Sequence, residues 1–294
     1  MIVVTGATGR LGSQVVDALL RHVPAESLGV SVRDVGRAAA LRDRGVRVRA
    51  GSFTDPDTLA HAFEGADQVL VVSAAIRGPE ASAANRAAID AAVRAGASRV
   101  LYTSHQAASA DSLFAAQVEH AATEAHLAEQ AARGVRVTAL RHGFYASTLE
   151  HYVPAALDSG ELRLPEDGPV SWTAHADLAA VDAAALTRPG VLDGVTAPLT
   201  AREALDLAEV ARLLGELTGR TITRVVVDDE EWAADAVAHG TPAAAAEFTL
   251  GIFRAARRGE FAVTDPTLED VLGRPAVPVR DVLASIVRSA RQVA

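Results

Sequence analysis

The first half of the chain alternates short apolar runs with longer segments in which apolar residues recur every three or four positions. Short apolar runs are typical of buried strands, and the longer period is typical of helices that bury one face. The pattern predicts strands at residues 2–5, 28–32, 46–50, 68–72, 99–103 and 136–140. It predicts helices at residues 11–21, 36–44, 56–63, 79–95 and 116–133. This alternation indicates the α/β class and a Rossmann-like, doubly wound parallel sheet, whose ligands gather where the strands end.

Turn and capping residues support these boundaries. The segment Thr54-Asp55-Pro56 predicts a helix start, with a capping side chain before a proline in the first turn. Gly45, Gly96 and Gly134 stand where helices are expected to end.

The alternation loosens after about residue 140. Helices are predicted at residues 177–186, 203–217, 230–238, 243–258 and 279–292, and one strand at 221–227. The acidic run at 228–231 is interpreted as a helix start that the helix dipole favours, not as a catalytic pair. No long linker separates the halves. We therefore expect a sheet domain at 1–145 and a smaller lobe at 146–294 that forms a substrate pocket and does not fold independently.

Three glycines, Gly6, Gly9 and Gly12, follow the first strand and lead into the start of the first helix. Such a turn is typical of pyrophosphate sites, because the backbone can approach the phosphates and the helix N-terminus attracts anions. The sequence therefore predicts a dinucleotide site whose first loop comprises Gly6, Ala7, Thr8, Gly9, Arg10, Leu11 and Gly12. For Arg10, a phosphate contact and a solvated side chain are weighed equally.

The end of the second strand indicates which dinucleotide is bound. An acid at this point binds the ribose 2′-hydroxyl of NAD, whereas an arginine accommodates the 2′-phosphate of NADP. Arg33 occupies the position, and its guanidinium suits a phosphate. Asp34 follows it, and the preference would weaken if that carboxylate turned inward. We therefore expect NADP(H) as the cofactor of residues 1–145.

Composition excludes several classes of protein. The net charge of −9 argues against general binding to nucleic acid or to an anionic membrane. No apolar run approaches the length of a membrane span, and the start of the chain lacks a signal-peptide pattern. We therefore expect a cytoplasmic protein. The absence of cysteine excludes disulfides and thiolate chemistry, and no metal site is predicted.

The sequence also contains no lysine, so all 28 basic side chains are arginine. Schiff-base catalysis is therefore excluded. A mechanism in which a lysine lowers the pKa of a catalytic tyrosine is excluded as well.

Five motifs together resemble the NmrA-like family, an atypical branch of the short-chain dehydrogenase/reductases. They are Gly-Ala-Thr-Gly-Arg-Leu-Gly at 6–12, Val-Arg-Asp at 32–34, Tyr-Thr-Ser at 102–104, His-Ala-Ala-Thr-Glu at 120–124 and Leu-Arg-His-Gly-Phe-Tyr at 140–145. Their order and spacing match over most of the chain. The likeness is greatest to bacterial members that reduce quinones or triphenylmethane dyes with NADPH, and the tail at 251–273 resembles the dye-reducing members.

The resemblance implies further NADP(H)-binding residues by position. Besides the glycine loop, they are Arg33, Ser73, Ala74, Ala75, Thr103, Ser104, His142, Gly143, Phe144 and Tyr145. Three positions depart from the family pattern. Ser52 and Phe53 replace an aspartate that many relatives carry, His142 replaces an asparagine, and Ala125 replaces a lysine.

The candidate chemistry follows from the missing lysine. Many short-chain dehydrogenases use a Tyr-x-x-x-Lys pair to move a proton to or from a carbonyl oxygen, and no tyrosine here has that partner. Quinones and cationic triarylmethane dyes need less assistance from a proton donor. Quinones delocalise the negative charge that hydride brings, and the cationic dyes become neutral. We therefore expect an NADPH-dependent reductase of a quinone or a similar conjugated or cationic acceptor, with catalysis mainly by orientation. The catalytic candidates are Tyr145, His142 and His120, with His105 as a further hydrogen-bond donor; for each, a structural role is the alternative.

Two other functions remain open. One is a redox sensor that binds NADP(H) without catalysis and reports to a protein partner. The other is a nucleotide-sugar epimerase, which the missing Tyr-x-x-x-Lys pair argues against. The expected partner is a small conjugated acceptor, with no nucleic acid and no membrane, and a homodimer is compatible with these expectations.

Overall fold

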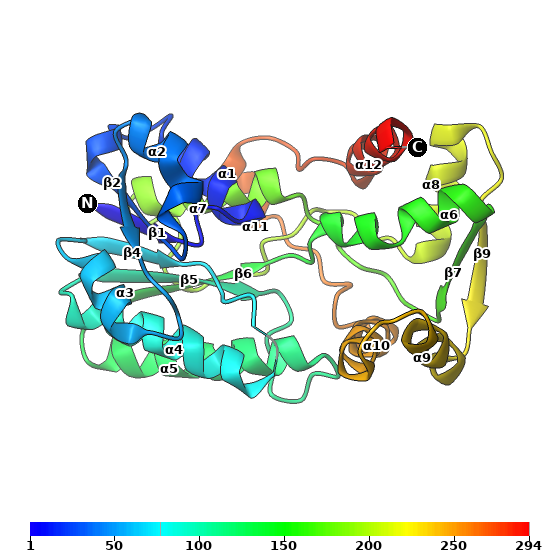
Figure 1. The fold of residues 1–294 in the computed structure, drawn as a ribbon, viewed down its shortest axis with the longest axis horizontal. Helices are drawn as coiled ribbons and strands as arrows, with labels where there is room; N and C mark the ends of the chain where they lie inside the picture. Colours follow the sequence, from blue (N-terminus) through cyan, green and yellow to red (C-terminus); the bar gives the residue numbers. More distant parts are fainter. Residues whose placement is uncertain (77, 294) are drawn as a thin grey trace.

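A seven-stranded parallel sheet forms the centre of the larger lobe in the computed structural model, which describes residues 1–76 and 78–293 (Figure 1). The strands are β1 (Ile2–Thr5), β2 (Leu28–Val32), β3 (Arg47–Ala50), β4 (Gln68–Val71), β5 (Arg99–His105), β6 (Arg136–His142) and β8 (Gly194–Val195). Their order is β3-β2-β1-β4-β5-β6-β8, so the direction of winding reverses between β1 and β4. The predicted α/β, doubly wound fold is therefore confirmed. The two-residue strand β8 was too short to predict.

Helices cover both faces of this sheet (Figure 1). One face carries α1 (Arg10–Leu19), α2 (Ala39–Asp43), α7 (His175–Thr187) and α11 (Thr267–Leu272), and the other carries α3 (Pro56–Phe63), α4 (Pro79–Arg94) and α5 (Ala115–Ala132). Neighbouring strand residues point to opposite faces, so Val4 packs in the first layer and Val3 in the second. The near-continuous apolar strands are thus explained by burial on both sides.

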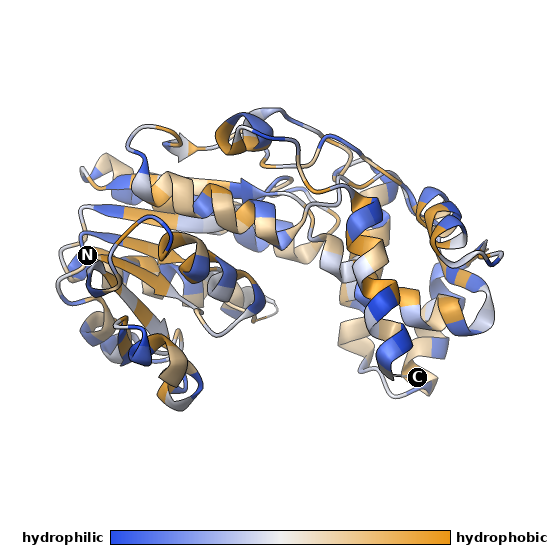
Figure 2. Cartoon of the chain, turned by 90° about the horizontal axis from the view of Figure 1, so that it is seen from above, coloured by the Kyte–Doolittle hydropathy of each residue, from blue (hydrophilic) through white to orange (hydrophobic). Residues whose placement is uncertain are grey.

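The smaller lobe has its own apolar core and a two-stranded parallel sheet. Its elements are η3 (Ala146–His151), α6 (Val153–Ser159), β7 (Glu161–Pro165), α8 (Leu207–Thr218), β9 (Thr223–Val227), α9 (Asp229–Ala238), α10 (Ala243–Arg257) and α12 (Val279–Val293). Seen from above, the two lobes form the arms of an arch, with hydrophobic strands enclosed by helices in the larger arm (Figure 2).

The expected boundary between residues 145 and 146 does not follow the packing. α7, β8 and α11 come late in the chain, yet α7 and α11 belong to the core of the large sheet, and β8 pairs with β6. The chain therefore crosses between the lobes several times. Leu178 and Leu268 complete the apolar layer over the sheet, which residues 1–145 alone would leave exposed.

Most predicted elements are present, with local differences. Residues 36–44 divide into the short helices η2 (Val35–Ala38) and α2, and η1 (Ala25–Ser27) precedes β2. α8 begins at Leu207 because Asp206 and Glu209 form a capping box there. α3 begins at Pro56 as predicted, but the expected cap is wrong, since the side chain of Asp55 makes no capping hydrogen bond. β7, α6 and α11 were not predicted.

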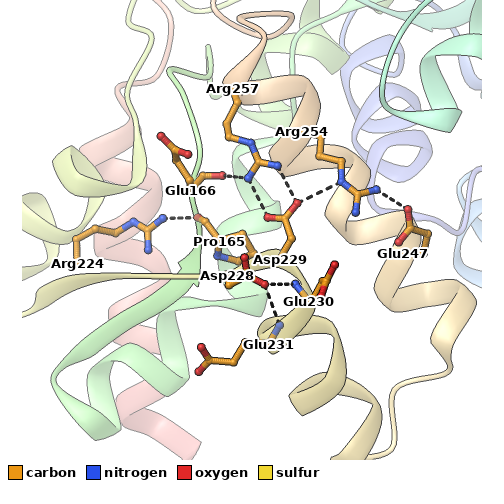
Figure 3. A network of polar contacts seen from close by, with 10 residues as sticks. All are labelled: Pro165, Glu166, Arg224, Asp228, Asp229, Glu230, Glu231, Glu247, Arg254 and Arg257. Atoms are coloured by element: carbon orange, nitrogen blue, oxygen red, sulfur yellow. Dashed lines mark hydrogen bonds and ion pairs between the residues drawn. The ribbon is translucent and has the colours of Figure 1, made fainter.

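The acidic run at 228–231 starts α9, as the sequence predicted, and two of its side chains have polar partners in the smaller lobe (Figure 3). Asp228 caps the helix by accepting from the backbone N–H groups of Glu230 and Glu231. The carboxylate of Asp229 accepts a bidentate pair of hydrogen bonds from Arg257, at 2.9 and 2.8 Å, and a third from Arg254. This network joins α9 to α10 and has a structural role.

Candidate functional site

A cleft of about 670 Å³ opens where β1, β2, β3 and β4 end, at the point where the winding of the sheet reverses. Ligands of open α/β sheets bind at this point. Eleven of the predicted coenzyme-binding residues line the cleft: Gly6, Thr8, Gly9, Arg10, Leu11, Gly12, Arg33, Ser73, Ala74, Ala75 and Tyr145.

The glycine turn gives the cleft its floor. Gly6 has a φ of +63°, which favours glycine, and a Cβ at Gly12 would overlap the carbonyl oxygen of Gly6. α1 can therefore start close against the turn. Its N-cap residue, Gly9, offers no side-chain cap, so the first N–H groups of the helix are open to an anion.

Two exposed arginines, Arg33 and Arg37, stand at the end of the cleft beyond β2. Within the described residues neither guanidinium has a hydrogen-bond or ion-pair partner. Asp34 does not compete with them, because its carboxylate is exposed and accepts a hydrogen bond from the backbone N–H of Gly36 at 2.9 Å. Between them and the turn lies Ser31, whose buried hydroxyl has no partner.

The opposite side of the cleft is built by Tyr145, which follows β6, and His175, which begins α7. Their ring centroids lie 4.3 Å apart. Burial lowers the pKa of His175 to about 4, with the charges of Arg10 and His142 adding to the effect. Burial raises the pKa of Tyr145, and the nearby carboxylate of Asp182 raises it further. Both side chains are therefore neutral near pH 7.

Arg10 forms a bidentate ion pair with Glu150 of η3, with both Nη–Oε distances at 2.7 Å. This contact links the glycine turn, which lines the cleft, to the smaller lobe. The hydrogen bonds from Arg10 lower the pKa of Glu150.

Six predicted coenzyme-binding residues do not line the cleft: Ala7, Thr103, Ser104, His142, Gly143 and Phe144. Thr103 accepts a hydrogen bond from the backbone N–H of Ser73, so it holds the loop after β4. Ser104 donates to Glu124, which also receives two hydrogen bonds from Arg141. These side chains therefore support the loops behind the cleft.

His142 is fully buried and pairs with the equally buried Asp182 of α7, with 2.7 Å between Nε2 and Oδ1. The Nδ1 atom of His142 and the Oδ2 atom of Asp182 have no hydrogen-bond partner. His142 therefore reaches neither the cleft nor the pocket described next. His142 also lowers the pKa values of His105, His120 and His175 electrostatically, in each case after burial, which is the larger cause.

A second, smaller pocket of about 70 Å³ branches from the cleft at Ser73, Ala74 and Ile76. His120, Tyr102 and Asn85 line it. The hydroxyl of Tyr102 lies 2.8 Å from Nδ1 of His120 and 3.2 Å from Nδ2 of Asn85. Burial lowers the pKa of His120 to about 4 and raises that of Tyr102.

The other aromatic side chains near the two cavities divide between core and pocket. Phe144 and Trp172 are buried in the core of the smaller lobe, whereas Phe248 lines the small pocket. His105 lies edge-on to Phe144 and Phe261, and its Nδ1 lies 2.7 Å from the side-chain amide of Gln117. Burial holds the pKa of His105 well below its usual value.

Sequence reasoning missed Ser31, Arg37 and His175 in the cleft and Asn85 in the pocket. Arg37 could have been found, since it stands one turn beyond Arg33 in the segment after β2. His175 and Asn85 carry no such signal, because they come from helices that only the packing brings to the site.

Within residues 1–76 and 78–293, no cluster of three or more histidine or acidic side chains could hold a metal ion. None of the helices that the structure describes is both long and apolar enough to span a membrane.

Comparison with known proteins places this geometry in a family. Residues 1–269 match the NmrA-like family. The chain is 30% identical over 282 residues to quinone oxidoreductase 2 of Escherichia coli strain K12, with 96% of each chain covered. It is 33% identical over 278 residues to an NAD(P)H azoreductase of Xenophilus azovorans, with 94% of each covered. The crystal structure of Citrobacter sp. triphenylmethane reductase complexed with NADP(H) superposes with a TM-score of 0.90 at 29% identity, covering 97% of this chain and 100% of that one. The expected resemblance is thus confirmed, and the chain belongs to the NmrA-like family.

Proposed function

We propose that this protein is an NADPH-dependent reductase that transfers hydride to a quinone or a similar conjugated or cationic acceptor. It is an oxidoreductase of a family whose similar members are a quinone oxidoreductase, an azoreductase and a dye reductase. The observation that carries the coenzyme assignment is the cleft at the reversal point, with an open helix N-terminus at its floor and two unpaired guanidiniums at one end.

The residues of the cleft fit NADP(H) on three counts. The turn at Gly6 and Gly12 leaves room for a pyrophosphate against the start of α1. Arg33 and Arg37 are free to take the 2′-phosphate, because Asp34 is engaged with Gly36. The buried hydroxyl of Ser31 has no hydrogen-bond partner in the protein, and the ribose of the coenzyme could provide one.

This chain's residues hold and orient the reactants. When bound, the coenzyme supplies a hydride. Tyr145 and His175 form the wall of the cleft opposite the arginines and restrict how a flat ring can lie there. Tyr145 and His120 line the cavities and are proposed to contact the reactants directly. His142 is proposed to act only through its buried pair with Asp182, which sets the charge near Tyr145.

The test is a steady-state assay that follows NADPH absorbance with a panel of quinones, azo dyes and triphenylmethane dyes. We expect oxidation above the enzyme-free rate with at least one of these classes. Tight NADPH binding without oxidation in the whole panel would instead support a redox sensor. Absence of binding to both NADPH and NADH, measured by calorimetry, would overturn the proposal.

A further inference from the structure

The small pocket beside the cleft combines apolar walls with an ordered set of polar side chains. It is formed between α4, β5, α5 and α10, and Phe248 contributes one wall. Because Ser73, Ala74 and Ile76 line both cavities, a molecule in the pocket would adjoin a molecule in the cleft. A volume of about 70 Å³ suits the edge of a single ring rather than a whole polycyclic acceptor.

A series of hydrogen bonds links Ala74, Asn85, Tyr102 and His120 along the pocket. The backbone N–H of Ala74 donates to Oδ1 of Asn85 at 2.8 Å, and a backbone N–H cannot accept. The amide of Asn85 is thereby oriented, and its Nδ2 donates to the hydroxyl of Tyr102. The same hydroxyl lies 2.8 Å from Nδ1 of His120 and can donate its own proton to that nitrogen.

These hydrogen bonds bear on which ring nitrogen of His120 carries the proton. The ring is neutral near pH 7, because burial lowers its pKa to about 4. When Tyr102 donates to Nδ1, the single ring proton lies on Nε2. In that arrangement His120, which lines the pocket, presents an N–H donor.

We infer that the pocket is the acceptor site and that the Nε2–H group of His120 donates a hydrogen bond to a quinone-type carbonyl oxygen. This inference rests on the proposed function. The quinone gains the hydride and one solvent proton and becomes a hydroquinone, while the coenzyme is oxidised to NADP⁺. Negative charge develops on the quinone oxygen, and a fixed donor stabilises it. The neutral imidazole keeps its proton, and Asn85 and Tyr102 are positioning residues.

Glu119 favours cationic acceptors in the same pocket, whereas His120 favours quinones. Its carboxylate lines the cavity next to His120 on α5. A negative charge there disfavours an oxyanion and favours a cationic acceptor. Glu119 and His120 together therefore set the ratio of activity toward quinones to activity toward cationic triphenylmethane dyes, which gain hydride at carbon and form no oxyanion.

The experiment compares kcat/KM of the full chain with a benzoquinone and with a cationic triphenylmethane dye. We expect His120→Phe to lower the quinone value about 100-fold and the dye value less than about 3-fold. His120→Gln keeps an N–H donor and should recover much of the quinone value. Glu119→Gln should move the quinone-to-dye ratio in the opposite direction. The NADPH dissociation constant should stay within about 2-fold for all three variants.

Equal losses with both acceptors, or no loss with either, would overturn the role of His120. A direct measurement is ¹⁵N NMR of the imidazole, which should show the Nε2–H tautomer in the wild type and a mixture in Tyr102→Phe. An Nδ1–H tautomer in the wild type would contradict the inference even if the enzyme reduces quinones. Failure of the proposed function has a different signature, namely an unmodified chain that binds NADPH but reduces neither acceptor.

Discussion

The large cleft and the small pocket lie side by side but are formed by different kinds of groups. The cleft relies on backbone groups at the glycine turn and on exposed arginines at its rim. The pocket relies on buried side chains that fix one another through hydrogen bonds. Coenzyme affinity and acceptor choice should therefore be separable by mutation. The following predictions test that separation, beginning with the largest expected effect.

Gly12→Ala should abolish tight coenzyme binding, because the new Cβ overlaps the carbonyl oxygen of Gly6 and pushes α1 away from the turn. We expect the dissociation constant of NADPH to rise at least about 100-fold. This corresponds to a loss of about 3 kcal/mol in binding free energy, which is at the upper end of the usual cost of overpacking. Calorimetry measures it. Gly134→Asn is the control: a Cβ there meets open space at the end of α5, and asparagine tolerates the positive φ of +90° better than most residues, so coenzyme binding should be unchanged. Retained binding in a folded Gly12→Ala variant would contradict the pyrophosphate assignment.

Arg33→Ala should weaken NADPH binding far more than NADH binding. A charge-assisted contact to the 2′-phosphate is worth about 1.5–3 kcal/mol, or roughly 10- to 150-fold in affinity. Arg10→Ala is the matched control, because a contact near the pyrophosphate affects both coenzymes alike. If Arg33→Ala weakened the two coenzymes equally, the 2′-phosphate role would be excluded.

The pocket should also make stability depend on pH through His120. Its pKa is about 4 in the folded chain, below the usual 6.5, so the unfolded state binds more protons between these values. The contribution is present above about pH 6.5 and is lost as the pH falls toward 4. Between pH 7 and pH 5 the wild type should lose about 1–2 kcal/mol more unfolding free energy than His120→Phe. Urea titrations measure this difference, and His105 and His175, which shift in the same direction, remain in both proteins. Parallel losses in the two proteins would show that His120 is not held neutral.

Glu150→Gln should have the smallest effect. The ion pair with Arg10 is about half exposed on both sides, and such pairs contribute at most about 1 kcal/mol to stability. Removing a negative charge near the pyrophosphate should tighten NADPH and NADH binding by the same small factor. A change of acceptor preference in this variant would show that the two regions are coupled.

Much of the fold could be predicted from local patterns. Six strands of the large sheet and the helices between them follow from apolar periodicity. The glycine turn follows from three residues close together in sequence. The elements β7 and α6 pack in the core of the smaller lobe, and α11 packs against the large sheet; they were missed because no strong local signal marks them. The return of α7 and α11 to the large sheet was missed because no local signal encodes it.

The sequence indicated which loops lie at the cleft more reliably than which side chains face it. Position at the end of a strand places a residue near the cleft, and Arg33 and Ser73 do line it. Thr103, Ser104 and His142 also stand at or near strand ends, but their side chains point to Ser73, Glu124 and Asp182. Because side chains alternate along a strand, nearness to the end does not give their direction.

The sequence by itself determined the sheet, the dinucleotide loop and the absence of any lysine-assisted chemistry. These depend on the order of neighbouring residues or on composition. Only the tertiary structure decided which way the polar groups face. Asn85, Tyr102 and His120 come from α4, β5 and α5. The hydrogen bonds among them therefore form only when the three elements pack together.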